Sequence, residues 1–191
     1  ANGTDLLLEN HPQTPENTMA VGKKNIDHLE ENAKAAVLAY YEERGRLYDI
    51  MEELEKASAI YQQSQNKENF SMMRIEQNVY PTAANDRLIF FQTSLHLPLA
   101  EKTFTERNLC EVFDRKTGAY IPIEDLFICP LEELGSQLLA LAHLSDADRA
   151  DMEAAFRREY IFFTEDSLCI DFPAGSLTNY KEQYIVPLKY T

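Results

Sequence analysis

The amino-acid sequence predicts an α+β fold, with a flexible tether over residues 1–24 and a single domain over 25–191. A helical pattern of apolar residues covers 25–64, and extended segments rich in β-branched and aromatic residues follow it. Two shorter helical patterns then precede a last third of β character. We therefore expect a long N-terminal helix packed on an antiparallel sheet, with two further helices inserted before a C-terminal β-hairpin and a closing strand.

The first helix is predicted by apolar residues at steps of three and four, beginning with Ile26, Leu29 and Ala33. A continuous helix over 25–64 would be about 60 Å long, whereas a compact chain of this size is about 40 Å across. Gly45 lies between two arginines, and glycine costs about 1 kcal/mol in a helix interior relative to alanine. We therefore expect a bend or a break at Gly45.

Three extended segments over 70–80, 87–97 and 104–113 are separated by proline-containing linkers and predict an antiparallel meander. The third segment leads into a turn at 114–118. There the Asp114 carboxylate can accept hydrogen bonds from backbone amides two residues on, and Gly118 can adopt a positive φ. Glu124 and Asp125 then place negative charge at the start of a short helix.

The C-terminal third begins with an apolar stripe over 131–144, which predicts a helix. Ser145, with Asp148 three residues later, is typical of an N-cap and predicts a second helix to about residue 158. The hairpin is expected over 160–172 and the closing strand over 183–190. Pro187 favours an edge position for that strand, because proline donates no ladder hydrogen bond.

The net charge of −14 argues against nucleic acid or an anionic membrane surface as a partner. A cationic partner is compatible with this charge, although acidic surfaces also serve solubility. Acidic residues cluster along the expected first helix, at 30–31, 42–43 and 52–55. These clusters predict a solvated polar face, with an acidic docking surface as the alternative.

No residue pattern specifies a reaction, a metal or a cofactor. The four histidines are scattered without HExxH or HxH spacing, and the three cysteines form no CxxC pair. Glycine-rich phosphate loops and a G-x-S-x-G motif are also absent from the sequence. We therefore expect a non-enzymatic protein without a cofactor, in which His96 is the one histidine near a functional loop.

The order of several short motifs carries a resemblance to a known family. Phe113-Asp114-Arg115-Lys116-Thr117-Gly118 is followed by Ile123-Glu124-Asp125-Leu126-Phe127, and a late hairpin spans 160–172. Over about 25–191, this order resembles the RsiV-like extracytoplasmic domain. That domain occurs in anti-sigma factors that sense lysozyme and is also attached to some peptidoglycan deacetylases. The chain departs from the family at 95–100, where the histidine is kept and the usual glycines are missing, and again at 173–180.

The resemblance implies a non-enzymatic extracytoplasmic binding or sensing domain, membrane-tethered or secreted in a bacterium. Its ligand would be a cationic protein such as lysozyme, or a cell-wall fragment. The chain has no membrane span of its own, and its start at Ala1 fits a processed chain with an upstream anchor. The alternatives are an accessory domain of a cell-wall-modifying enzyme whose catalytic part is absent here, and an enzyme in its own right. The ligand is expected at the loops 95–102 and 173–180, through His96, Pro98, Lys102, Pro173, Gly175 and Tyr180.

Overall fold

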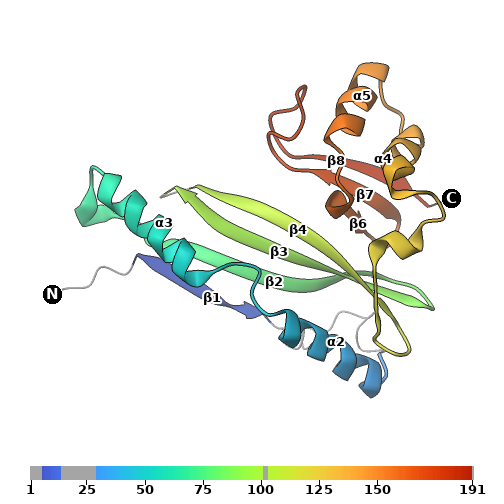
Figure 1. Cartoon of the computed structure of the whole chain (residues 1–191), viewed down its shortest axis with the longest axis horizontal. Coiled ribbons are helices and arrows are strands. Elements are labelled where there is room, and N and C mark those ends of the chain that lie inside the picture. The colour runs from blue at the N-terminus through green and yellow to red at the C-terminus, as the bar shows by residue number, and fades with distance from the viewer. Residues whose placement is uncertain (1–5, 14–28, 101–102, 191) are drawn as a thin grey trace.

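Residues 6–13, 29–100 and 103–190 are described by the computed structural model, which confirms the α+β class (Figure 1). Within these ranges one sheet has the strand order β1-β2-β3-β4-β5 and a second has the order β6-β7-β8. Neighbouring strands β2 to β5 pair antiparallel, as predicted, whereas β1 pairs with β2 in parallel, so the larger sheet is mixed. Its strands are β1 (Leu7–Gln13), β2 (Met73–Ala84), β3 (Leu88–Ala100), β4 (Thr103–Asp114) and β5 (Tyr120–Ile121).

Strand β1 corrects part of the expected tether, because Leu7–Gln13 are paired with the sheet. The rest of 1–24 lies outside the described residues. The long strands also extend beyond their predicted ends. β2 continues through Pro81 and β3 through Pro98, and at each proline the pairing register shifts. A bulge accommodates a residue that cannot donate a ladder hydrogen bond, so proline did not end these strands.

The expected first helix is broken at Gly45. Helix α2 (Glu31–Arg44) ends there with φ +61°, and α3 (Ile50–Gln63) follows. The predicted start at Asn25 lies outside the described residues. The side chain of Gln77, on β2, holds the connection: its Nε2 donates to the Gly45 carbonyl oxygen at 3.0 Å, and its Oε1 accepts from the backbone N of Leu47 at 2.9 Å. The sequence-based expectation of a break is confirmed.

The turn after β4 forms as predicted and packs directly on α2. The Asp114 Oδ1 accepts from the backbone N of Lys116 at 3.0 Å and of Thr117 at 2.8 Å. Gly118 has φ +71°, and a Cβ atom there would lie 2.2 Å from the Ala33 carbonyl oxygen. Glycine is therefore required both by the backbone conformation and by the close approach of the helix. A short helix η2 (Ile123–Leu126) follows.

The C-terminal module, residues 131–190, carries the second sheet. Ser145 caps its second helix as predicted, since its Oγ accepts from the backbone N of Asp148 at 3.2 Å. Pro187 lies on β8, an edge strand, also as predicted. The first helix of the module ends at Ala140, before the predicted residue 144. The elements are α4 (Leu131–Ala140), α5 (Asp146–Ala155), η3 (Arg158–Tyr160), β6 (Ile161–Phe163), β7 (Ser167–Phe172) and β8 (Tyr184–Lys189).

Two hydrophobic clusters lie on opposite faces of the larger sheet, at the end that carries β5. Phe91 and Phe113 pack against α2, whereas their strand neighbours Phe90 and Val112 pack against the C-terminal module. This period-two alternation is the one expected of a strand buried on both faces. The other end of the larger sheet lies beside α3, and the C-terminal module does not extend over that end (Figure 1). One face of the larger sheet is therefore covered by the C-terminal module over only part of its length.

Candidate functional site

The sheet face turned toward the C-terminal module changes from apolar to polar along β3 and β4. Phe90 and Val112 are buried against the module. Beyond them the same face carries polar side chains and a thiol, which offer the module little apolar surface to bury. Packing against the apolar cluster of the module extends to Cys110, and the polar residues Asn108 and Glu106 beyond it line a cleft. The register places Gln92 opposite Cys110, Ser94 opposite Asn108 and His96 opposite Glu106.

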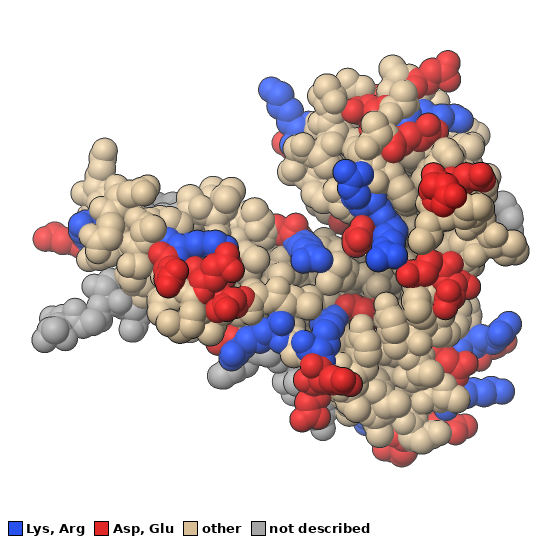
Figure 2. Space-filling model, in the orientation of Figure 1, with Lys and Arg blue, Asp and Glu red and all other residues tan. Residues whose placement is uncertain are grey.

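A cleft of about 520 Å³ lies where the two parts of the molecule separate. We call it the β4 cleft. Residues 104–110 of β4 form one side, residues 159–162 of η3 and β6 form the other, and Asp171, Pro173 and Gln183 complete the lining. Figure 2 shows the notch between the extended sheet and the C-terminal module. The lining combines aromatic surface with three carboxylates, those of Glu106, Glu159 and Asp171.

Hydrogen bonds connect the polar side chains of the cleft. Asn108 Nδ2 donates to Glu106 Oε1 at 3.1 Å and to Asp171 Oδ2 at 3.3 Å. Gln183 Nε2 donates to the Asp171 Oδ1 at 2.7 Å and to its Oδ2 at 2.9 Å. Burial raises the pKa of Asp171, and the hydrogen bonds from Gln183 and Asn108 oppose that rise. The Asp171 carboxylate is thus held by two amides and joined through Asn108 to a second carboxylate.

The Asn108 Oδ1 is buried and accepts no hydrogen bond within the described residues. Reversing the amide would place this oxygen against the carboxylates of Glu106 and Asp171, so its orientation is fixed by its neighbours. The lining of the cleft is therefore rich in acceptor atoms: three carboxylates line it, and the buried amide oxygen of Asn108 lies beside two of them. Such a set suits a ligand that brings hydrogen-bond donors and positive charge.

One predicted site residue, Pro173, lines this cleft, and a second, His96, contacts two of its lining residues. The His96 ring stacks on Phe104 with centroids 4.9 Å apart, and its Nε2 is 3.7 Å from Glu106 Oε1. Phe104 and Glu106 both line the cleft, as does Pro173. Leu99 from the first predicted segment and Pro173 from the second therefore meet at one cavity.

The other predicted site residues lie elsewhere. Pro98 lines a separate pocket of about 450 Å³ beside α3. Gly175 occupies a turn with φ +78° and has open space around it, and Tyr180 packs against Tyr184 with ring centroids 4.3 Å apart. Lys102 lies outside the described residues. The expected loop at 95–102 is also corrected, because β3 extends to Ala100 and Leu95 is buried.

Asn108, Asp171 and Gln183 were not predicted from the sequence as site residues. A signal for Asp171 existed, because it is a charged residue within the otherwise apolar strand segment 168–172. The polar alternation of Glu106, Asn108 and Cys110 was a weaker signal. Neither pattern reveals that β4 and β7 approach each other.

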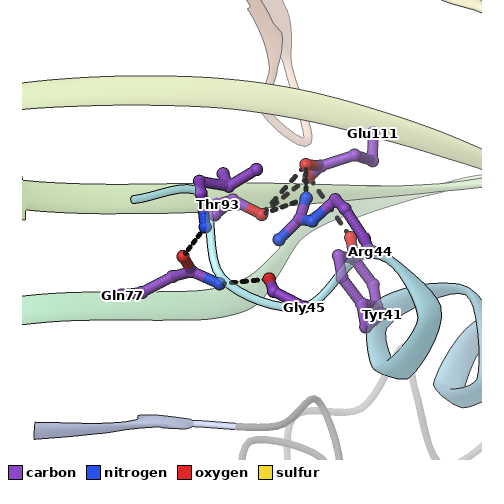
Figure 3. Close-up of polar contacts among 7 residues, drawn as sticks. Tyr41, Arg44, Gly45, Gln77, Thr93 and Glu111 are labelled. Carbon is purple, nitrogen blue, oxygen red and sulfur yellow. Dashed lines mark hydrogen bonds and ion pairs between the residues drawn. The ribbon is translucent and has the colours of Figure 1, made fainter. Parts of the chain in front are cut away.

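A second polar cluster lies on the opposite face of β4, against α2 (Figure 3). Glu111 pairs with Arg44, and Thr93 Oγ1 lies 3.0 Å from each oxygen of the Glu111 carboxylate. The Tyr41 hydroxyl donates to Glu111 Oε2 at 3.2 Å. The Arg44 guanidinium also lies 4.7 Å from the centroid of the Tyr41 ring. These contacts fasten the last turn of α2 to the sheet.

Burial determines the protonation of groups on both faces of β4. The Glu111 side chain is 5% exposed, and burial raises its pKa to about 6 although Arg44, Thr93 and Tyr41 oppose the shift. Burial, with a contribution from the charge of Glu111, raises the pKa of the Cys110 thiol to about 12. Cys110 is therefore protonated at neutral pH, as is typical of a structural thiol.

The acidic clusters of the helices are not uniformly solvated. Glu53 is 3% exposed and lies 2.7 Å from Lys56 Nζ, which corrects the expectation of a wholly exposed acidic face. Among the described residues, no group of three or more His, Cys, Asp or Glu is placed to hold a metal ion. The helices in the described ranges are too short or too polar to cross a membrane.

Comparisons with known proteins show a likeness to solved structures. No protein-family model matches the chain, and no curated protein matches it. Among solved structures, the chain is similar to the crystal structure of a DUF3298 family protein from Pseudomonas aeruginosa PAO1, at 18% sequence identity and a TM-score of 0.39. The match covers 69% of this chain and 65% of that chain.

Proposed function

We propose that this chain is a non-enzymatic, extracytoplasmic binding or sensing domain of a bacterial envelope, tethered to the membrane or secreted. Its ligand is a cationic protein held in the β4 cleft. The observation that carries the proposal is the set of acceptor atoms on Glu106, Asn108 and Asp171 in that cleft. The resemblance to the RsiV-like domain makes lysozyme the first protein to test.

The electrostatics of the molecule support a cationic ligand at two distances. The net charge of −14 attracts a positively charged protein over about one Debye length, which is about 8 Å at physiological salt. At contact, carboxylates already held by Asn108 and Gln183 need little reorganisation to accept donors. Long-range attraction raises the association rate, and the fixed acceptors favour the correct pose.

The test is a titration of the full chain with lysozyme by isothermal calorimetry, at about 20 mM and about 300 mM salt. We expect binding at low salt that weakens about tenfold or more at high salt. The double variant Glu106→Gln, Asp171→Asn should weaken binding at low salt about tenfold. The matched control, Glu153→Gln on the exposed face of α5, should leave binding unchanged.

Two outcomes would contradict this proposal. Absence of lysozyme binding at low salt would exclude lysozyme as the ligand, and equal effects of the cleft variant and the control would exclude the cleft. A soluble peptidoglycan fragment serves as a second probe in the same experiment. Binding of that fragment, without binding of lysozyme, would replace a cationic protein with a cell-wall ligand.

A further inference from the structure

We propose that an extended segment of the cationic partner binds in the β4 cleft as an added strand on β4, and that it places a Lys or Arg side chain among Glu106, Asn108 and Asp171. This inference rests on the proposed function and specifies how the partner is held. The partner's backbone would pair with the free edge of β4 in the larger sheet.

The first support is the unequal pairing of β4. On one side, β3 pairs with β4 from Thr103 to Asp114. On the other side, β5 pairs only with Val112 and Phe113. Within the described residues, the stretch 103–111 thus has no strand partner on the β5 side. In an antiparallel pair, every second residue directs its N–H and C=O away from its partner, so this edge offers backbone donors and acceptors.

The second support is the position of the cavity. Residues 104–110 line the β4 cleft, and they fall within the unpaired stretch of β4. A smaller cavity of about 230 Å³ continues from Leu109 past Glu111 to Tyr120 of β5. The space beside β4 thus leads toward the place that β5 occupies. A segment lying there would extend the line of β5 along the sheet.

The third support is the chemistry on the walls. Successive side chains of an added strand point to opposite faces of the sheet. Those on the face of the C-terminal module would meet Glu106, Asn108 and Asp171, the acceptor atoms of the cleft. Tyr160 and Phe162 in the same lining supply apolar surface for the stem of a long side chain. A Lys or Arg side chain fits both features.

Charge also favours a foreign segment over a second copy of this chain. Two copies would each bring a net charge of −14 to the contact, and like charges oppose association. The cleft beside this edge brings Glu106 of β4 and Asp171 of β7 together through Asn108, and Arg107 is the single basic residue in its lining. A basic segment would offset the negative charge of these carboxylates. The same edge of a second copy would instead bring a second set of carboxylates to the contact.

The experiment uses the full chain and a synthetic peptide of about ten residues, the length of a long strand, in which Thr and Lys alternate. Amide hydrogen exchange is followed residue by residue by NMR. We expect alternate amides of residues 103–109 to exchange at least about tenfold more slowly with the peptide bound. The variant Glu106→Gln, Asp171→Asn should weaken peptide binding about tenfold at low salt, and Glu153→Gln should not.

Two control peptides separate strand addition from simple charge attraction. One replaces each Lys by Glu and should not bind. The other keeps every Lys but replaces each Thr by Pro, which removes backbone donors, and should bind about tenfold more weakly without protecting β4. Equal binding of the proline peptide, or binding of the Thr-Lys peptide without protection of residues 103–109, would overturn the inference.

Failure of this inference can be told from failure of the proposed function. If lysozyme binds through the cleft and neither lysozyme nor the peptide protects residues 103–109, strand addition is wrong and the binding function stands. If the peptide protects these amides and lysozyme does not bind, the edge accepts basic segments and the choice of lysozyme is wrong. Self-association of the chain that protects the same amides without any peptide would overturn the choice of a foreign segment.

Discussion

Glu111 is a buried carboxyl group on which the placement of α2 depends. It is held by Arg44, Thr93 and Tyr41, and these partners come from α2 and β3. Removing one partner of a buried ion pair leaves the other charge without compensation, which typically costs about 3–5 kcal/mol. The cluster therefore explains why α2 stays on the sheet although the helix does not continue through Gly45 into α3.

The raised pKa of Glu111 predicts a pH dependence of stability. The folded-state pKa is about 6 and the reference value is 4.5. The stabilising contribution is therefore complete below about pH 4.5 and is lost as the pH rises through about 6. Its size is about 2 kcal/mol, from about 1.4 kcal/mol per pKa unit.

Urea unfolding of the wild type and of Glu111→Gln from about pH 4.5 to 7.5 measures this contribution. Because other groups titrate alike in both proteins, the difference in unfolding free energy isolates Glu111. We expect the wild type to lose about 2 kcal/mol relative to Glu111→Gln over this range. Glu55→Gln, an exposed change on α3, is the control and should give a flat difference. A flat difference for Glu111→Gln, or one of opposite sign, would contradict the predicted titration.

Individual residues were predictable where their signal is local. The capping role of Ser145, the amide bonds of Asp114, the helix break at Gly45 and the positive φ of Gly118 each depend on neighbours within a few positions. Asn108 and Asp171 were not predictable, because the two residues that share a hydrogen bond are 63 positions apart. Polar residues on strands also serve solvation, so their types alone do not identify a site.

The turn at 114–118 is an element whose geometry depends on a helix far away in the sequence. It brings Gly118 against the backbone of Ala33. Gly118→Ala should destabilise the protein by about 3 kcal/mol or more, because a positive φ costs an alanine about 1–2 kcal/mol and the Ala33 backbone must also move. Urea unfolding provides the measurement.

Gly175 provides a matched control for this substitution. Its φ of +78° is similar to that of Gly118, but no atom lies within 4 Å of the position of an added Cβ. Gly175→Ala should therefore cost only the backbone term, about 1–2 kcal/mol. Equal losses in the two variants would show that contact with α2 adds nothing to the requirement for glycine at 118.

Elements were predicted well where periodicity was strong and poorly where it was not. The meander, the broken helix and the late hairpin follow from apolar spacing and turn residues. β1 was missed because its sequence, Leu-Leu-Glu-Asn-His-Pro-Gln, is mostly polar and contains proline. It is a strand because β2 offers an edge for pairing, which is tertiary context that propensity does not contain.

At the scale of the whole molecule, the site results from incomplete cover of a long sheet. The C-terminal module packs on the apolar end of the face that carries Phe90 and Val112, and the polar remainder forms a wall of the β4 cleft. The α+β class was predictable from the order of elements. The division into two sheets, and with it the cleft, was not, because it depends on where the module docks.

The most direct measurement is an amide chemical-shift map of the full chain titrated with lysozyme at about 20 mM salt. The account predicts shifts concentrated at residues 103–110 and at Asp171, Ala174 and Gln183 beside them. Shifts centred on the acidic residues of α2 and α3, with those positions unchanged, would contradict the β4 cleft as the binding site.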